Sequence, residues 1–367
     1  MDSRNSCTSQ STNWGQSTQK VTRRGFMQLA GLAAGFAAAI GSSLGGARQL
    51  QAATQGEKPP TGAPSARRTF KAIDFSINAW FPGVAERFAE IGIIRWLGIY
   101  QETLKGWTPE YMIERFDMAG VEKGGLLACW AAEGLGGRDC RVEADEVYAA
   151  VNKYPDRFFG IVGVSPLPGR WSKYYPRTYI KYAVQQLGFK GVHMYPHWFG
   201  VKINDRRMYP IYETVCELDV PFVFQAGPGT HQSNARICGK PQWIDDIVRD
   251  FPTIKIVGIH GGGHWTPEMI TMAGKDPNTY MGMDVPPPSM WKASGVLDYI
   301  VRDPFAALQS DKGRSAGFLT GADKVFWGTD FPVQEWVESL RQFDELGLPE
   351  EVARKVARDN VIKLFKL

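Results

Sequence analysis

Two residues stand out for acid–base chemistry, Asp330 and His260. Asp330 lies in the stretch Gly328-Thr329-Asp330-Phe331-Pro332, and three glycines follow His260. Carboxyl and imidazole groups are common general acids and bases, and an aspartate among aromatic residues is expected to have a raised pKa. We predict that both residues are catalytic, with Asp330 as the general base. The structural alternatives are a turn-forming Asp330 that accepts backbone N–H bonds and a His260 that packs in the core.

Nine further residues are predicted to contact a substrate: Asp74, Ser76, Asn78, His193, Tyr195, His197, Gln225, His264 and Trp80. Asp74, Ser76 and Asn78 lie at alternate positions, so they share one face of a strand. The same holds for His193, Tyr195 and His197. At about 3.3 Å per residue, His193 and His197 would lie about 13 Å apart in a continuous strand and could not share a metal ion. If that strand ends near Pro196, His197 is a loop residue and the restriction is lifted.

The elements that must position these residues alternate between strands and helices from residue 69 onward. Eight strands are expected at Phe70–Asn78, Gly124–Ala132, Phe158–Pro166, Gly191–His197, Pro221–Gly227, Lys255–Gly261, Thr279–Val285 and Lys324–Asp330. Helical stretches between and after them include Tyr111–Glu122, Val142–Lys153, Met208–Leu218, Gln334–Leu346 and Pro349–Leu367. This pattern over about 300 residues predicts a single (β/α)8 TIM barrel. No G-x-G-x-x-G or P-loop follows an expected strand, which disfavours a doubly wound open sheet.

The histidines cluster at one end of this barrel. All five of them, with His231 as the fifth, fall at or just after the ends of the fourth, fifth and sixth expected strands. Active sites of TIM barrels lie at the C-terminal ends of the strands. The histidines therefore predict an active site at that rim.

Residues 1–53 are predicted to be an export signal. Thr22–Gln28 contains a twin arginine, a weakly apolar run follows to about Gly46, and Ala52-Ala53 offers a cleavage site. The alternative is a basic tail before a membrane helix, but the run is marginal for a span of about 20 residues. We therefore expect export to the periplasm by the twin-arginine translocase. Residues 54–68 are predicted to be a linker, and residues 69–367 the barrel.

The charge distribution limits the partners of the mature protein. Residues 1–53 hold five of the 42 basic residues and one of the 38 acidic residues, so the rest of the chain is formally neutral. Neutrality argues against nucleic acid or an anionic membrane as the main partner and favours a small-molecule substrate. The five cysteines form no C-x-x-C pair, and a Cys140–Cys238 disulfide is left open.

Six motifs resemble those of the amidohydrolase-related family, which includes the aminocarboxymuconate-semialdehyde decarboxylase-like hydrolases. They are AIDFSIN at Ala72–Asn78, GFKGV at Gly188–Val192, FVFQAG at Phe222–Gly227, KIVGIHGGG at Lys255–Gly263, VFWGTDFPV at Val325–Val333 and NVIKLF at Asn360–Phe365. They correspond, in order, to the family's IDxHxH, GFKGI, VxxHxG, KIVxxHxGG, xxFGSDYPV and NAxxLF. The resemblance covers essentially all of the predicted barrel.

The resemblance implies a divalent metal, usually zinc. The family's ligands are two first-strand histidines, a fifth-strand histidine and the eighth-strand aspartate, and a sixth-strand histidine binds metal or substrate. His260 and Asp330 match this pattern, whereas Ser76, Asn78 and Gln225 stand where histidines are expected. Neutral oxygens are poor zinc ligands. We therefore expect no cofactor, and a metal, if present, on His260 and Asp330.

Three functions follow from these residues and the resemblance. The first is a metal-free hydrolase acting on a small cyclic or aromatic compound, with or without a carboxyl group. The second is a metal-dependent non-oxidative decarboxylase, in which His193 or His231 joins the two matching ligands. The third is a catalytically inactive periplasmic binding protein. The resemblance leaves a homodimer open.

Overall fold

The computed structural model describes residues 68–88, 100–131, 140–167, 175–227, 237–302 and 321–367. The predicted export signal and all but the last residue of the predicted linker lie outside these ranges, as does His231. Within the described part of the chain, no helix is long and apolar enough to cross a bilayer. Cys238 is a buried free thiol in this structure, and the side chain of Cys140 is outside what the structure describes.

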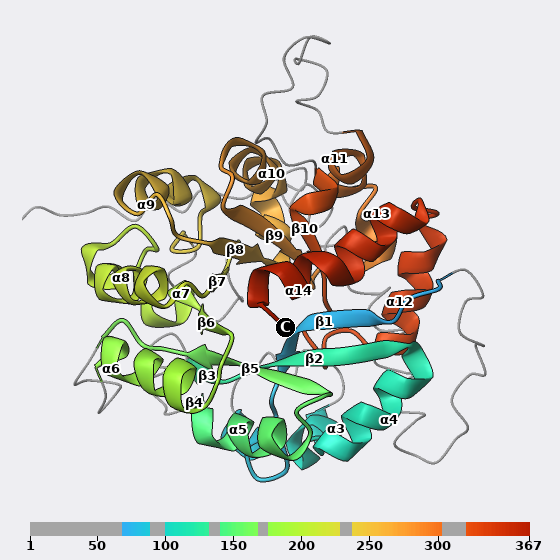
Figure 1. The fold of residues 1–367 in the computed structure, drawn as a ribbon, viewed down its shortest axis with the longest axis horizontal. Coiled ribbons are helices and arrows are strands. Elements are labelled where there is room, and N and C mark those ends of the chain that lie inside the picture. The colour runs from blue at the N-terminus through green and yellow to red at the C-terminus, as the bar shows by residue number, and fades with distance from the viewer. Residues whose placement is uncertain (1–67, 89–99, 132–139, 168–174, 228–236, 303–320) are drawn as a thin grey trace, which may run out of the picture. The chain divides into compact units, whose positions relative to one another are not determined.

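Eight parallel strands form the barrel, in the order β1-β2-β5-β6-β7-β8-β9-β10 (Figure 1). They are β1 Ala72–Asn78, β2 Val121–Leu127, β5 Phe158–Gly163, β6 Gly191–Met194, β7 Phe222–Gln225, β8 Ile256–Ile259, β9 Thr279–Met283 and β10 Val325–Trp327. A parallel bridge between Ile77 and Phe331 joins the first strand to the chain after the last. Asn78 N donates to Phe331 O at 3.1 Å in the same place. The predicted TIM barrel is therefore confirmed.

Helices follow most strands and cover the outside of the barrel (Figure 1). They are α3 Tyr100–Lys105, α4 Pro109–Ala119, α5 Ala144–Lys153, α6 Pro176–Lys181, α7 Pro196–Phe199, α8 Tyr209–Leu218, α9 Ile244–Asp250, α10 Thr266–Lys275, α11 Val296–Arg302, α12 Trp336–Glu345, α13 Glu350–Arg354 and α14 Asn360–Phe365. Local sequence sets their ends, as α4 shows. Thr108 caps it by accepting from Tyr111 N, Pro109 opens it, and Gly120 closes it in the left-handed region.

Seven of the eight predicted strands end earlier than expected, and two of them show why. The stretch Gly124–Ala132 divides, because β2 stops at Leu127 and Cys129–Ala131 (β3) pairs antiparallel with Cys140–Val142 (β4). The stretch Gly191–His197 stops at Met194, since Pro196 has no N–H for a sheet and instead opens the short helix α7. His197 is therefore a helical residue at the rim.

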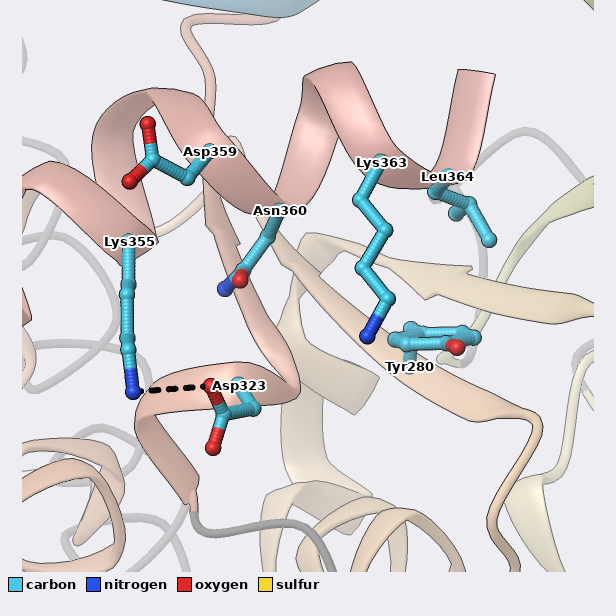
Figure 2. Close-up of a pocket in the computed structure, with 7 residues that line it drawn as sticks. All are labelled: Tyr280, Asp323, Lys355, Asp359, Asn360, Lys363 and Leu364. Atoms are coloured by element: carbon cyan, nitrogen blue, oxygen red, sulfur yellow. Dashed lines mark ion pairs between the residues drawn. The ribbon is translucent and has the colours of Figure 1, made fainter. Parts of the chain in front are cut away.

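A pocket lies at the opposite end of the barrel from this rim. Its lining includes Tyr280 near the start of β9, Asp323 just before β10, and Lys355 and Lys363 from the C-terminal helices. Figure 2 shows Lys355 paired with Asp323, at 3.0 Å, and Lys363 extending toward Tyr280. Because TIM-barrel chemistry takes place at the C-terminal ends of the strands, we do not assign the active site to this pocket.

Candidate active site

Five polar residues meet at the C-terminal rim of the barrel. Asn78 and Gln225 are the last residues of β1 and β7, His260 and Asp284 directly follow β8 and β9, and Asp330 lies three residues beyond β10. Four of them are less than 9% exposed, and His260 is only slightly more open. Parallel strands end at the same side of a barrel, so the fold brings these side chains into one region.

His260 and Asp284 form a buried ion pair. His260 Nδ1 lies 3.0 Å from Asp284 Oδ1, and the His260 backbone N–H donates to the same oxygen at 2.7 Å. Burial alone would lower the pKa of His260, but the charge and hydrogen bond of Asp284 outweigh it and raise that pKa to about 9. The pKa of Asp284 is lowered despite its burial, chiefly by His260. His260 is therefore an imidazolium at neutral pH.

Asp330 is a buried carboxyl group held by Asn78. Asn78 Nδ2 donates to Asp330 Oδ1 at 2.8 Å. Burial is the main cause that raises the pKa of Asp330, to about 7; Asp284 raises it further, while His260 and Asn78 lower it. The raised pKa expected from the sequence is confirmed. Asp330 can thus both hold and release a proton near neutral pH.

The backbone is strained at both catalytic candidates. His260 has a φ of 58° and Asp330 a φ of 46°, in the left-handed region that residues with a Cβ rarely adopt. Such conformations cost about 1–3 kcal/mol each and cluster at functional sites. Both His260 and Asp330 lie in the segment that directly follows a barrel strand.

Asp74 braces the turn that carries Asp330. Its carboxylate accepts hydrogen bonds from Thr329 N at 3.2 Å, from Trp336 Nε1 at 2.8 Å, and from the Thr329 hydroxyl. The residue is 0% exposed, and burial raises its pKa to about 7. Asp74 was predicted to contact a substrate, but its oxygens are occupied by the protein, so its role is to position the turn.

Ser76 and Gln225 keep polar atoms without hydrogen-bond partners among the described residues. These atoms are Ser76 Oγ and Gln225 Oε1. Ser76 nevertheless lies close enough to Asp284 to help lower its pKa. Buried polar groups are normally paired. An atom that lacks a partner can therefore form a hydrogen bond with a bound molecule.

His193, Tyr195 and His197 form an aromatic group at the end of β6. The Tyr195 ring packs edge-on against His193 at 4.3 Å and His197 at 6.1 Å between centroids. It packs at a tilt of 39° against Trp198, at 4.0 Å. Burial lowers the pKa of both histidines to about 3, so they are neutral. Both ring nitrogens of His193 lack partners among the described residues. The three rings lie together, but they do not share a strand face as predicted, because β6 ends at Met194 and His197 belongs to α7. Their contact with a substrate stays a prediction.

Two predicted contact residues lie elsewhere. Trp80 is buried and packs on Phe88, with ring centroids 5.6 Å apart, so it belongs to the core. His264 is exposed, because Gly261–Gly263 turn the chain away from the rim before it. His231 is outside the described residues.

Asp284 is the functional residue that sequence reasoning missed. It lies at the end of the seventh predicted strand, in Met283-Asp284-Val285. An acidic residue at the C-terminal end of a barrel strand is a signal in its own right. Its significance depends on His260, which is 24 residues away in the chain.

Comparison with known proteins shows the family to which this chain belongs. A sequence model of the Amidohydrolase family matches residues 111–367, more than half of the chain. The chain belongs to the amidohydrolase family. This membership confirms the resemblance drawn from the motifs.

Several proteins similar to this chain carry named activities. It is 32% identical over 101 residues to 2-keto-4-carboxy-3-hexenedioate hydratase of a Sphingobium species, a match that covers 22% of this chain and 30% of the hydratase. The chain thus spans less than a third of that curated relative. In structure it resembles a 5-carboxyvanillate decarboxylase of Novosphingobium aromaticivorans with bound manganese, with a TM-score of 0.58, 16% identity and coverage of 83% of this chain and 99% of that one.

Two more solved structures share the fold. An uncharacterised TIM-barrel protein of Bordetella bronchiseptica has a TM-score of 0.58 at 23% identity, over 81% of this chain and 99% of that chain. A 4-oxalomesaconate hydratase of Rhodopseudomonas palustris has a TM-score of 0.53 at 18% identity, over 81% of this chain and 96% of that chain. At these identities the likeness shows the fold alone.

The family's metal fits poorly with the side chains that this chain offers. Among the described residues, no three His, Cys, Asp or Glu side chains come together as a metal site. His260 Nδ1 is bonded to Asp284, which leaves Nε2 as the one ring nitrogen of His260 for a metal ion. One imidazole, one carboxyl group and neutral amide or hydroxyl groups make a poor site for a transition metal.

Proposed function

We propose that this protein is a lyase that removes carbon dioxide from a small carboxylated aromatic or unsaturated compound. One observation carries the proposal: a buried carboxyl group, Asp330, shares the rim with a buried imidazolium–carboxylate pair, His260 and Asp284. Decarboxylation without an oxidant needs a proton donor for carbon, and a positive charge can bind and orient the substrate carboxylate. The rim supplies both groups.

In this scheme His260 binds the substrate carboxylate. Its imidazolium is the positive charge nearest to Asp330 that acts on the pKa of that residue. A charge-assisted hydrogen bond in a buried site is stronger than a neutral one. Asp284 keeps His260 protonated and sets its orientation through two bonds to one oxygen.

Asp330 then acts as the acid. Its carboxyl proton is transferred to the ring or alkene carbon that bears the carboxylate. The bond from this carbon to the carboxylate breaks, carbon dioxide leaves, and the bonding electrons restore the unsaturated system. Asp330 is left as a carboxylate and regains a proton from water. A pKa of about 7 suits a group that must pass through both states in each cycle.

Neighbouring side chains suit a flat, oxygenated substrate. Tyr195 and Trp198 offer aromatic faces at the rim, and apolar burial with stacking favours planar rings. His193 and Gln225 offer unpartnered polar atoms for substrate hydroxyl or carbonyl groups. The relatives named above with known activities are one decarboxylase and two hydratases, which supports a lyase over the hydrolase expected from the sequence.

Hydration is the second candidate, favoured by the Sphingobium hydratase as the relative of highest identity among those named above. The same Asp330 would deliver a proton to carbon while water adds to the neighbouring carbon. Both reactions form a carbon–hydrogen bond, whereas hydrolysis does not.

The test uses this difference. Purified protein is incubated in D2O with hydroxylated benzoates, with unsaturated dicarboxylates and with aromatic lactones. Decarboxylation predicts carbon dioxide release and one deuterium, seen by NMR, at the carbon that lost the carboxylate. Lactone opening without a carbon–deuterium bond would refute the lyase proposal. Ligand binding without turnover of any compound would instead favour the binding protein.

Export of the protein is a separate proposal. We propose that residues 1–53 direct the protein through the twin-arginine translocase to the periplasm, on the basis of Arg23 and Arg24. Replacing both arginines by lysine should leave the protein in the cytoplasm, as measured by cell fractionation. Periplasmic recovery of that variant would contradict the proposal.

A further inference from the structure

The side-chain amide of Asn78 is surrounded by oxygens. Asn78 Nδ2 lies 2.8 Å from Asp330 Oδ1, 3.3 Å from Asp330 O and 3.0 Å from Phe331 O. All three are acceptors, so the group that faces them must be a donor. An amide oxygen in that position would meet three other oxygens and no hydrogen.

The other end of the amide agrees with this orientation. Tyr195 Oη donates to Asn78 Oδ1 across 3.4 Å. The amide therefore has its N–H groups toward Asp330 and its oxygen toward Tyr195, and the three oxygens around Nδ2 decide the choice, because a tyrosine hydroxyl can pair with either end of an amide. Asn78 is 5% exposed, and the pairing links the end of β1 to the turn after β10.

An N–H group in this place has a direct consequence for cations. The hydrogens of an amide carry partial positive charge, and the amide nitrogen has no lone pair free to bind a metal. The resemblance places a metal-binding histidine at position 78 and a metal-binding carboxylate at position 330. Here the strand-one group directs positive charge at the carboxylate and offers no shared ligand for a metal ion.

We propose that the Asn78 amide takes the place of the family's metal ion at Asp330, and that this centre binds no divalent cation. Asn78 is then a positioning residue that holds the carboxyl group through hydrogen bonds rather than through coordination. The remaining positions agree with this. Ser76 and Gln225 present neutral groups, and His260 Nδ1 is bonded to Asp284. The inference stands apart from the proposed reaction, because metal binding is measured without turnover.

The first experiment measures Mn²⁺ and Zn²⁺ on the full-length protein. Protein purified without chelator is analysed for bound metal and then titrated with each ion by calorimetry. We expect less than about 0.1 equivalents of metal and no binding at micromolar concentration. One tightly bound equivalent that Asp330→Asn abolishes would overturn the proposal. The metal analysis and the titration are made on the wild-type protein, so they do not depend on the folding of the Asn78→Asp variant.

The second experiment replaces the donor by an acceptor. Asn78→Asp turns oxygens toward Asp330, so two carboxylates face each other as hard metal ligands. We expect Mn²⁺ affinity to rise by at least about tenfold. The matched control is Asn204→Asp, because Asn204 Nδ2 also donates to a carboxylate, Asp246 Oδ2, at 2.8 Å outside the site. If a folded Asn78→Asp variant bound Mn²⁺ no better than the wild type, the amide would not be what excludes the metal.

Discussion

His260 and Asp284 form two hydrogen bonds through a single carboxylate oxygen. Asp284 Oδ1 lies 3.0 Å from His260 Nδ1 and accepts from the His260 backbone N–H at 2.7 Å. The same oxygen also accepts from Val285 N at 3.1 Å. The pair thus fixes both the ring and the backbone of His260 and sets its charge. The proposed carboxylate-binding role depends on that charge.

Removing the charge of Asp284 should move the alkaline limit of activity. Asp284→Asn keeps a similar shape but loses the attraction that holds the pKa of His260 at about 9. Burial then lowers that pKa below 6.5, so His260 is neutral at about pH 7.5. We expect kcat/KM at this pH to fall by roughly 100-fold, and the alkaline limb, which loss of the Asp330 proton sets near pH 7 in the wild type, to move to lower pH. An unchanged alkaline limb would show that the reaction does not need the charge of His260; Asp246→Asn serves as the control.

The same pair makes folding stability depend on pH. The pKa of His260 is 6.5 as a free group and about 9 in the folded protein. Its contribution is therefore fully present below pH 6.5 and is lost as pH rises through about 9. The Tm of the wild type should fall over this interval, as followed by circular dichroism. In Asp284→Asn this fall should be absent.

Replacement of Asp330 separates catalysis from stability. Asp330→Asn removes the proposed proton donor, so kcat should fall by about 10²–10⁴-fold. Asn78 can still donate to the new amide oxygen, which preserves the fold. The pKa of Asp330 rises from 3.8 in the unfolded chain to about 7 in the fold, so ionisation destabilises the wild type as pH rises between these values.

The stability of the two proteins should therefore diverge with pH. At about pH 8 the Asp330→Asn variant should melt above the wild type, and the difference should shrink toward about pH 4. Calorimetric melts across this range provide the measurement. A variant that is less stable at every pH would show that the Asp330 carboxylate is structurally required.

The hydrogen bond from the Thr329 hydroxyl to Asp74 should contribute more to folding stability than a similar bond on the surface. Thr329→Val removes the hydroxyl that donates to the buried carboxylate of Asp74. We expect a loss of about 1–3 kcal/mol in the free energy of unfolding, measured by urea titration, because a buried acceptor is left without its donor. Thr271→Val is the matched control: its hydroxyl bonds to Pro267 O on an exposed helix, and the change should cost under about 0.5 kcal/mol. Equal losses for the two variants would contradict the bracing role.

The histidines of the rim should divide into two groups by NMR. His193 has a pKa lowered to about 3 by burial, whereas His260 has one raised to about 9. The ring nitrogens of His193 should show a neutral pattern that is constant between about pH 5 and 8, and His260 should titrate above this range. Assignment uses His193→Gln and His260→Gln. A His193 signal that titrates near pH 6.5 would show that its ring is solvated.

The periodicity of the sequence was sufficient to predict the barrel. Alternating strands and helices, with Gly and Pro at their ends, give eight parallel strands whatever the details of packing. Because these strands all end on one side, residues at their ends are gathered at the rim, and so Asp330 and His260 could be identified in advance. The motifs that carry the family resemblance are also local, and the absence of histidine at positions 76, 78 and 225 is visible without a structure.

Pairing between strands was decided only by the tertiary structure. Asn78 and Asp330 are 252 residues apart, and they meet because the Ile77–Phe331 bridge sets the register in which the barrel closes. Asp74 shares a strand face with Asn78, yet its oxygens are bound to Thr329 and Trp336 rather than free for a substrate. Side-chain partners across a barrel depend on closure and register, which are properties of the whole chain. The sequence therefore determined which groups stand at the rim, and the fold decided which of them are paired, charged or available.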